Sequence, residues 1–363
     1  MNKPLLRGRQ MFCVVLLAGF FIQGCDPLVT TFPPETSANL YQAVNQTTPP
    51  AEAPVLTVMT WNIRFGAARI PWFGDSCGDR VLLTRAEVEQ NLQGLADVIN
   101  SLRPDILLMQ EVDVDSKRSA YIDELQWLLD HTDLNYGAYA SMWESQFVPS
   151  DGLGRVNTGN AVLSRWKITD TERIRLPLRG DQDALTRYFY LRRNILKVRV
   201  AVPNTDAFYV LDVHTTAFAT DDTKQQHLQR FKEAIDAVAA TGAPFVAGGD
   251  LNTLPSGSDS TNYCDEERCA GDPPGSCPDG SDYTGEAAWV APLYEAYDFA
   301  VPLDDYQLEN RIYFSQGFPE PNKKLDYLLT RKDGWVPGSD RTHQEASLRS
   351  DHVPVTARLV VAP

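Results

Sequence analysis

The sequence has little positive charge for its size. Its 363 residues include 33 Lys and Arg against 48 Asp and Glu, so the formal net charge is −15. A folded domain this acidic repels polyanions unless a local basic patch or a bound metal ion compensates. The charge therefore disfavours tight binding to nucleic acid, although it does not exclude a nuclease whose metal ion supplies the local positive charge.

Long apolar runs are scarce as well. Met11–Ile22 has about the length of the apolar region of a signal peptide and is too short for a secure transmembrane helix. Basic side chains precede it at Lys3, Arg7 and Arg9. The run closes on Ile22-Gln23-Gly24-Cys25, which resembles a bacterial lipobox. We therefore predict a signal peptide over residues 1–24 and a mature lipoprotein that starts at lipidated Cys25, with an ordinary cleaved signal as the alternative.

These features predict an extracytoplasmic protein anchored to a membrane, in the periplasm or on the cell surface. Asp26 resembles the inner-membrane retention signal of enterobacterial lipoproteins, but the choice of membrane stays open. Residues 1–24 hold three basic and no acidic side chains, so their removal takes the net charge from −15 to −18. Residues 25–54 are rich in Thr, Pro, Ala and Asn without helical or strand periodicity, which predicts a solvated tether.

Cysteine is rare, and two of the six cysteines lie at Cys13 and Cys25 in the leader and lipobox. The others are Cys77, Cys264, Cys269 and Cys277. Outside the cytoplasm, four such cysteines predict up to two disulfides, whose pairing cannot be deduced from the sequence. A zinc site is the alternative, but the four include no Cys-x-x-Cys pair and no histidine lies among them.

What is present from residue 55 onward predicts one large mixed α/β domain over residues 55–363. Strand-like apolar runs occur at Val55–Ile63, Asp105–Gln110, Asn160–Leu163, Asn194–Val200, Phe208–Val213, Pro244–Ala247, Leu325–Thr330 and Val353–Val361. Apolar residues at helical spacing predict helices after the capping-box pair Thr84 and Glu87, from about Thr223 to Gly242, and at Tyr121–Leu129. A Gly-, Pro- and Cys-rich insertion near 256–285 follows a suspected functional segment and is expected at its rim.

Polar residues follow several of the apolar runs, where strands of an α/β sheet end and ligands gather. They are Asn62, Glu111, His214, Asp250 with Asn252, and Asp351 with His352. Each has a structural explanation when taken singly. Glu111 could cap a helix, Asp250-Leu251-Asn252 could form an Asx-turn, and His214 could be a hydrogen-bonded core residue. Their recurrence at strand ends instead predicts a shared site that activates water beside a metal-held phosphate.

Six segments carry a more specific signal. They are Thr60-Trp61-Asn62-Ile63-Arg64, Met109-Gln110-Glu111-Val112-Asp113, Gly159-Asn160-Ala161-Val162-Leu163-Ser164-Arg165, Gly249-Asp250-Leu251-Asn252, Leu325-Asp326-Tyr327 and Ser350-Asp351-His352. In this order they resemble the endonuclease/exonuclease/phosphatase family. That family includes pancreatic-type deoxyribonucleases, apurinic endonucleases, neutral sphingomyelinases and inositol-polyphosphate phosphatases.

The resemblance implies a four-layer α/β sandwich, in which two packed mixed β-sheets are flanked by helices. It also implies hydrolysis of phosphate esters with a divalent cation, Mg²⁺ first and Mn²⁺ or Ca²⁺ as alternatives. Glu111 is then expected to be the principal metal ligand, with Asn62 and Asp351 in or next to the coordination shell. Hard oxygen donors of this kind suit Mg²⁺.

The same resemblance implies roles for the catalytic residues. Asp250 would orient or deprotonate the attacking water, and Asn252 would hold a phosphoryl oxygen. His352 would contact the phosphate or act as acid–base, oriented by Asp326. His214 matches a second histidine of the deoxyribonuclease and sphingomyelinase branches, where it can protonate the leaving oxygen or bind the transition state.

Three further residues are expected at the substrate. Arg193 resembles a phosphate-facing arginine of the bacterial members, although the adjacent Arg192 could match the same family position. Asn160 belongs to a motif that matches the family. Arg64 stands where the apurinic branch has an acid, which argues against that branch. It is expected either to contact substrate phosphate or to pair with a neighbouring carboxylate.

The substrate class stays open at this stage. An extracytoplasmic phosphodiesterase or phosphomonoesterase could act as a nuclease, as a sphingomyelinase or phospholipase C-type enzyme, or on small phosphate esters. The net negative charge disfavours long nucleic acids and anionic lipids. A non-catalytic surface lipoprotein that binds through the same fold is the alternative of another class. Beyond substrate and membrane, no protein partner is expected.

Overall fold

The structure is a computed structural model that describes residues 28–74 and 77–361. The predicted signal peptide and Cys25 lie outside the described residues. Among the described residues, no helix combines the length and the apolar character needed to cross a membrane.

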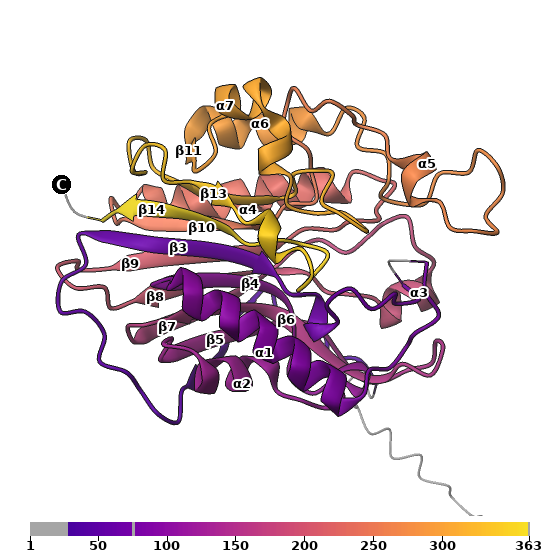
Figure 1. Cartoon of the computed structure of the whole chain (residues 1–363), viewed down its shortest axis with the longest axis horizontal. Helices are drawn as coiled ribbons and strands as arrows, with labels where there is room; N and C mark the ends of the chain where they lie inside the picture. The colour runs from indigo at the N-terminus through magenta and orange to yellow at the C-terminus, as the bar shows by residue number, and fades with distance from the viewer. Residues whose placement is uncertain (1–27, 75–76, 362–363) are drawn as a thin grey trace, which may run out of the picture.

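Two seven-stranded mixed sheets pack face to face (Figure 1). In spatial order, the first sheet contains β13 (Arg341–Thr342), β14 (Val355–Val360), β3 (Val55–Asn62), β4 (Ile106–Asp113), β6 (Gly154–Ser164), β5 (Tyr136–Val148) and β2 (Asn39–Gln42). The second contains β1 (Glu35–Thr36), β7 (Ile168–Arg175), β8 (Asn194–Val200), β9 (Phe208–His214), β10 (Phe245–Asp250), β12 (Asp326–Thr330) and β11 (Asp298–Phe299). The pairs β3–β4 and β9–β10 are parallel, whereas the other named pairs are antiparallel.

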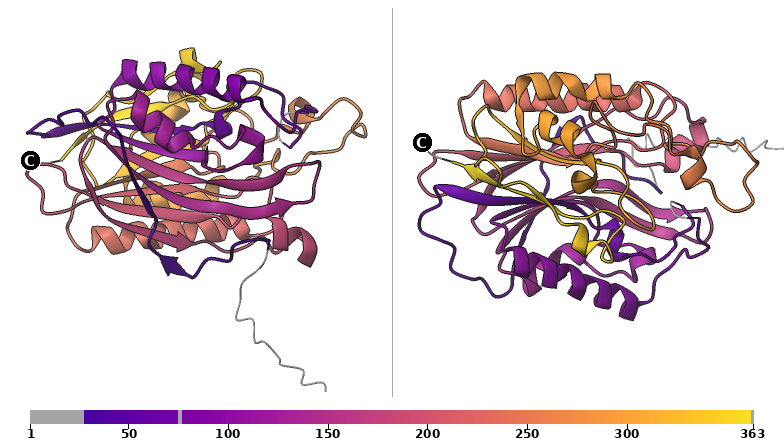
Figure 2. Two further views of the ribbon diagram at one scale, coloured as in Figure 1. Left: turned by 90° about the horizontal axis from the view of Figure 1, so that it is seen from below. Right: turned by 45° about the horizontal axis from the view of Figure 1, so that its top comes forward.

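Helices cover the outer faces of the two sheets (Figure 2). The first sheet is covered by α1 (Arg85–Leu102) and α2 (Glu124–His131), and the second by α4 (Thr223–Ala239) and α6 (Ala287–Ala296). Shorter helices are α3 (Ala184–Phe189), α5 (Cys264–Glu267) and α7 (Leu303–Leu308), with 3-10 turns at Arg64–Gly66, Lys117–Ser119, Asn310–Tyr313 and Gln344–Ala346. The predicted four-layer sandwich is confirmed.

The central strands read as continuous apolar runs because both of their faces are buried. In β4, Leu107 and Met109 pack against the helices, whereas Ile106 and Leu108 pack between the sheets. All eight predicted strand regions overlap observed strands, and all three predicted helices are present. The predicted capping box at Thr84 and Glu87 starts α1, as expected.

Two long strands were missed. Strand β5 is rich in Gly, Ala and Ser, and β7 carries alternating Thr, Asp, Glu and Arg side chains, so neither shows a clear apolar period. Both are held by long antiparallel pairings with β6 and β8. Partner strands supplied what the local sequence did not indicate.

The predicted solvated tether is wrong for the part of residues 25–54 that the structure describes. β1 pairs with β7 and β2 pairs with β5, so this segment lies along the open edges of both sheets. Val29 is buried and forms an isolated bridge with Ser145 in β5. The edge strand of a sheet has unpaired backbone N–H and C=O groups. Hydrogen bonds to these groups hold residues 35–42 on the sheets, although their polar composition suggested a solvated chain.

The four remaining cysteines form two disulfides, Cys77–Cys269 and Cys264–Cys277. This excludes the zinc alternative, because all four sulfur atoms are used. The first disulfide joins the loop after β3 to the Cys-rich insertion, across 192 residues of sequence. The insertion also packs inward through Tyr263 and Tyr283, beside Leu254 and Leu325. These last two residues lie next to the motif residues Asn252 and Asp326, so the insertion sits at the rim of the suspected site, as predicted.

Candidate active site

The polar residues that follow the central strands meet at one end of the sandwich. Asn62 lies opposite Gln110 in the parallel β3–β4 pair, and Asp250 lies opposite His214 in the parallel β10–β9 pair. The carboxyl ends of these strands therefore share an edge in each sheet. Asn62 joins the two sheets directly, because its Nδ2 donates to Asp250 Oδ2 at 3.1 Å.

A β-bulge aims Glu111 into this space. Met109 pairs with Ala161 but Val112 pairs with Gly159, so β4 has one more residue than β6 between these pairs. Glu111 sits in the bulge with φ 58°. Bulges of this kind redirect a side chain at the cost of local pairing. Asn62 Nδ2 also donates to Glu111 Oε1 at 3.1 Å, so one amide holds both Glu111 and Asp250.

Asp250 is the centre of the site. Its Oδ2 lies 3.3 Å from His214 Nε2 and 3.6 Å from His352 Nε2, in addition to the bond from Asn62. Its Oδ1 accepts from the backbone N–H of Asn252 at 3.0 Å. With Asp250 only 1 % exposed, its carboxylate is held by contacts with four residues. The group cannot turn away without breaking several of them.

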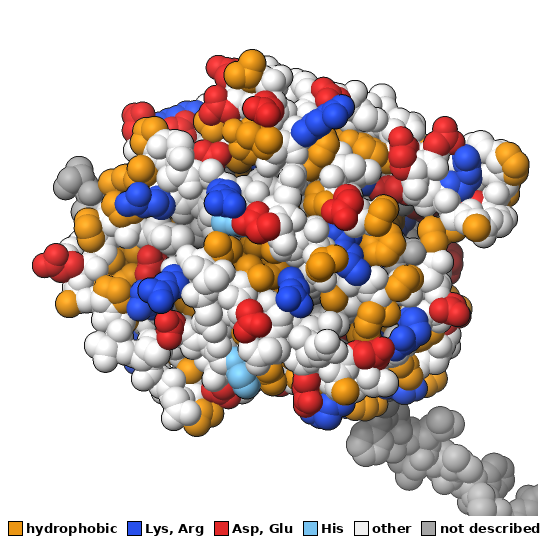
Figure 3. Space-filling model, in the orientation of Figure 1, with side chains coloured by type: hydrophobic (Ala, Val, Ile, Leu, Met, Phe, Trp, Pro, Cys, Tyr) orange, Lys and Arg blue, Asp and Glu red, His pale blue; other side chains and the backbone are white. Residues whose placement is uncertain are grey.

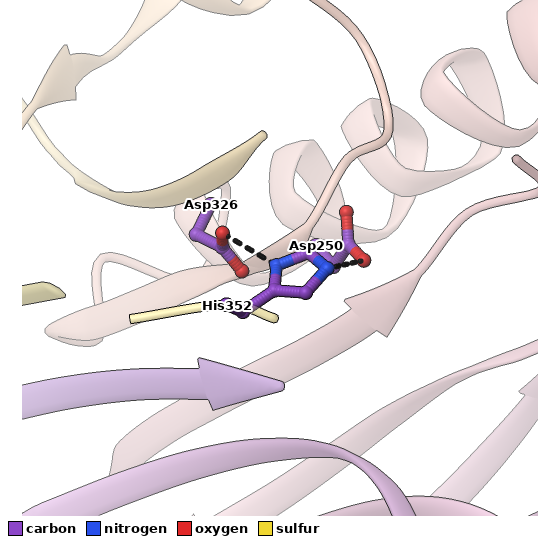
Figure 4. Close-up of side chains that lie close together, drawn as sticks. All are labelled: Asp250, Asp326 and His352. Atoms are coloured by element: carbon purple, nitrogen blue, oxygen red, sulfur yellow. Dashed lines mark hydrogen bonds and ion pairs between the residues drawn. The ribbon is translucent and has the colours of Figure 1, made fainter. Parts of the chain in front are cut away.

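His352 lies between two carboxylates (Figure 4). Its Nδ1 donates to Asp326 Oδ2 at 2.8 Å, which directs Nε2 towards Asp250. The backbone is fixed as well, because Trp61 Nε1 donates to the His352 carbonyl at 3.0 Å. An imidazole held in this way is oriented for proton transfer at Nε2.

The pKa shifts follow from burial and charge. Burial raises the pKa of Asp250 to about 7; the nearby His352 opposes this rise and Asp326 adds to it. Burial would lower the pKa of His352, but Asp326 and Asp250 outweigh it and raise that pKa to about 10. Burial and the Arg193 charge hold the pKa of His214 well below its usual range, so His214 is neutral. The site therefore holds one neutral and one protonated imidazole on either side of Asp250.

We expect kcat/KM to rise with pH through an inflection at or below about 7 and to fall again as pH approaches about 10. The rise reflects loss of the proton from Asp250, and a cation bound at Glu111 would move it to lower pH by attraction. The fall reflects deprotonation of His352. Initial rates across pH 5–10, on an ester whose leaving group does not titrate in this range, would measure both the rise and the fall of kcat/KM. A kcat/KM that decreases between pH 5 and 7 would contradict this assignment.

The donor set fits a hard divalent cation. Asp250, Asp326 and His352 offer ligand atoms within 4.8 Å of one another, but Asp326 and His352 already bond to each other. Glu111 is more accessible, with a side chain that is 24 % exposed. One or two carboxylates with amide oxygens and water are what Mg²⁺ uses in proteins. Glu111 is thus the carboxylate placed to hold the ion. Asn62 presents its amide nitrogen to Glu111, and its Oδ1 accepts from the backbone N–H of Arg64 at 3.0 Å, so the predicted metal role of Asn62 stays a prediction.

The motifs and the fold agree with a direct comparison of the sequence. The model of the endonuclease/exonuclease/phosphatase family matches residues 59–352, which is most of the chain. The chain belongs to this family. No curated protein matches the sequence significantly.

Solved structures show the family fold at low sequence identity. An endonuclease/exonuclease/phosphatase from Beutenbergia cavernae is 19 % identical with a TM-score of 0.55, over 85 % of this chain and 72 % of that one. The human Nocturnin catalytic domain with bound sulfate is 16 % identical with a TM-score of 0.53, over 90 % of this chain and 98 % of that one. Humanized TDP2 from D. rerio is 14 % identical with a TM-score of 0.50, over 85 % and 99 %. These likenesses support the fold, not a substrate.

Asp351 lies beside this family site and is paired. Its Oδ2 is 3.7 Å from Arg64 Nε, and its Oδ1 lies 3.1 Å from Ser350 Oγ. Burial would raise the pKa of Asp351, but Arg64, His352 and Arg69 outweigh it and lower that pKa. Ser350 donates to the Asn62 carbonyl at 2.8 Å, which ties this segment to the metal candidates. The predicted metal role of Asp351 stays a prediction.

Two predicted substrate contacts lie away from the open site. The Arg64 side chain is 1 % exposed, and its Nη1 donates to the carbonyls of Ala68 and Ile70, so the structure favours the carboxylate-pairing alternative. Asn160 is fully buried and donates to the Asn194 carbonyl. It lies on the face of β6 that points between the sheets, as Val162 does. Both side chains are buried and bonded within the protein, and their predicted contact with substrate stays a prediction.

Arg193 does reach the site. Its Nη1 donates to the His214 carbonyl at 3.3 Å, and burial lowers its pKa. Asn252 is close as well, with φ 45° and its Nδ2 bonded to the Thr215 carbonyl at 3.2 Å. The structure thus brings both predicted residues to the site, and their roles toward phosphate stay predictions.

Sequence reasoning missed the buried polar residues behind the site. Lys324 Nζ donates to the Asp326 carbonyl at 3.0 Å, and burial lowers the pKa of Lys324 to about 8. Gln110 Nε2 donates to Asp212 Oδ1 at 2.6 Å, and burial raises the pKa of Asp212 well above its usual value. The available signal was an acid or lysine inside an otherwise apolar run, a pattern that usually marks a bonded polar group.

Proposed function

We propose that this chain is a divalent-metal-dependent phosphoric ester hydrolase that acts outside the cytoplasm. The observation that carries the proposal is the convergence of Asn62, His214 and His352 on one buried carboxylate, Asp250, with Glu111 held by the same amide. A purely structural site would not need two imidazoles and a partly exposed carboxylate around a buried acid. Membership of the family supports the reaction class.

The residues divide the work of hydrolysis. Asp250, ionised above about pH 7, accepts a proton from the attacking water and orients it. His352, protonated and oriented by Asp326, donates a hydrogen bond to the phosphoryl group or a proton to the leaving oxygen. His214 is neutral and can donate only from one ring nitrogen, so its part is binding rather than charge stabilisation. A divalent ion at Glu111 would supply positive charge for the phosphoryl oxygens.

The location is part of the proposal. The lipobox at Cys25 and the leader before it support a lipid-anchored mature protein. The two disulfides use all four remaining cysteines, as expected in an oxidising compartment. The periplasm and the cell surface both meet this condition.

Hydrolysis of bis-p-nitrophenyl phosphate tests the reaction class. We expect turnover with Mg²⁺ that EDTA abolishes and that excess Mg²⁺ restores, because the phosphoryl charge needs the cation. The Asp250→Ala variant supplies the background rate under the same conditions. Turnover that does not exceed this background, or that is indifferent to EDTA, would defeat the proposal and favour a non-catalytic binding module.

A further inference from the structure

The N-terminal end of the described chain is fixed at one place on the domain. The backbone N–H of Thr30 donates to the Glu144 carbonyl at 2.9 Å, and that of Gln146 donates to the Leu28 carbonyl at 2.7 Å. Ser145 Oγ donates to the same Leu28 carbonyl at 3.0 Å. Leu28 to Thr30 are therefore held against β5 by an isolated antiparallel bridge between Val29 and Ser145, where β5 leads into the β5–β6 hairpin.

This attachment lies at the catalytic end of the sandwich. The β5–β6 hairpin continues beyond the carboxyl end of β4, the end that carries Glu111. The hairpin also contacts the end of α3 and the residues that follow it. Trp143 Nε1 donates to the Phe189 carbonyl at 2.7 Å, and the N–H of Arg192 donates to the Met142 carbonyl. The next residue, Arg193, bonds to His214 in the site. Figures 1 and 2 show the start of the coloured chain beside this hairpin and α3.

The distance from the expected anchor is short. Leu28 is three residues after Cys25, and three extended residues span about 10 Å at most. A lipid on Cys25 would therefore hold the β5–β6 hairpin at the bilayer surface. A free tether of thirty residues, which the composition suggested, would have left the orientation open.

Several segments around this attachment carry exposed apolar side chains. Phe147 at the hairpin is 53 % exposed, and Leu178 and Leu185 on either side of the α3 start are 41 % and 70 % exposed. Leu28 itself is 36 % exposed. Large apolar side chains on loops around an attachment point can enter the headgroup region of a bilayer, each adding apolar area removed from water.

A positively lined pocket adjoins the N-terminal segment. It has a volume of about 460 Å³ and is lined by Thr31, Phe32, Pro34, Arg175, Leu176, Pro177, Leu178, Arg192 and Arg230. The lining has three arginines and no carboxylate, in a protein of net charge −15. One of the three, Arg230, also pairs with Glu233. Local positive charge beside Leu178 suits the phosphates of a lipid surface.

Resting on the proposed function, we propose that this face, made of Leu28, Phe147, Leu178 and Leu185, docks on the lipid bilayer, and that the site hydrolyses phosphate esters of lipid head groups. Because the hairpin lies at the end of the sandwich where Glu111 is partly exposed, docking there would bring the site close to the membrane. Head groups are then the phosphate esters present at the highest local concentration. Long nucleic acids are disfavoured by the net charge of −15, and on the face shown in Figure 3 the Lys and Arg side chains are interspersed with Asp and Glu.

The test uses Phe147→Asp combined with Leu185→Asp, and the matched control Leu308→Asp. Leu308 is 87 % exposed in α7, on a different side of the molecule from the hairpin (Figure 1). The acylated full chain is reconstituted into vesicles of phosphatidylcholine, sphingomyelin and phosphatidylglycerol in equal parts, and head-group release is measured with Mg²⁺. Flotation of the Cys25→Ser form with the same vesicles measures docking without the lipid anchor.

We expect the double variant to lose at least about tenfold in both flotation and head-group release, because two exposed apolar side chains that would enter the bilayer become charged. Its turnover of soluble bis-p-nitrophenyl phosphate should stay within about twofold of the parent, as should every activity of the Leu308→Asp control. Docking is overturned if the double variant floats like the parent or if the control falls equally. Reduced flotation with unchanged head-group release would overturn the role of this face in lipid hydrolysis.

Failure of the underlying function gives a different pattern. A parent that hydrolyses neither the soluble ester nor the vesicle lipids, but whose flotation still depends on Phe147 and Leu185, would refute the hydrolase and leave membrane docking standing. A parent that hydrolyses only the soluble ester would refute the lipid substrate and leave the hydrolase standing.

Discussion

Replacing Asp250 with Asn is expected to lower kcat by about a thousandfold or more. The amide keeps the size of the carboxylate but cannot accept a proton, and it removes the negative charge that faces His214 and His352 at 3.3 and 3.6 Å. Steady-state turnover of bis-p-nitrophenyl phosphate, with protein loading high enough to resolve the residual rate, measures the effect.

The matched control is Asp279→Asn, the same chemical change on an exposed residue of the insertion. The melting temperature of Asp250→Asn is expected to stay within about 5 °C of the parent, because a buried ionised carboxylate is itself costly to fold around. A loss of activity that came with unfolding would appear in the melt. A kcat within about threefold of the parent, with the fold intact, would remove Asp250 from the mechanism.

Replacing Glu111 with Ala is expected to lower kcat by about a hundredfold or more at fixed Mg²⁺ and to raise the Mg²⁺ concentration needed for half-maximal activity by about tenfold. Glu111 is the carboxylate that the bulge of β4 turns into the site, and its side chain is 24 % exposed. Without it, oxygen donors at that position are lost while Asp250 remains. Activation curves with Mg²⁺ and Mn²⁺ separate a metal role from an effect on the base.

The control for this change is Glu89→Ala, which removes a carboxylate from the solvent face of α1. A structural role of Glu111 would predict a lower melting temperature with an unchanged metal requirement. The metal assignment fails if the activation midpoint for Mg²⁺ does not move and kcat falls by less than about threefold.

Much of the site could be predicted because its chemistry restricts the residue types. Water activation needs an acid or imidazole at a strand end, and Asp250, His352 and Glu111 stand where apolar runs stop. The central strands could be predicted equally well, because a strand buried on both faces is an uninterrupted apolar run in the sequence. Strand β5 was not, because small residues such as Gly137 and Ala140 pack well there without a strong pattern of their own.

The direction in which a side chain points depended on its contact partners in the tertiary structure, which the local sequence pattern does not identify. Arg64 could have faced substrate, but the carbonyls of Ala68 and Ile70 and the carboxylate of Asp351 turn it inward. Asn160 sits in a matching motif, yet β6 directs it between the sheets. Motif membership thus placed these residues near the site without deciding what they touch.

By itself, the sequence determined the family and the positions of the central strands along the chain, and it predicted the residues of the candidate site, because these follow from residue type, apolar period and motif. Only the tertiary structure decided the disulfide pairing, the inward turn of Arg64 and the course of residues 28–42 along both sheet edges. Each of these is a contact between segments far apart in the chain. Such contacts are set by packing and by open sheet edges, which have no signature in the local sequence.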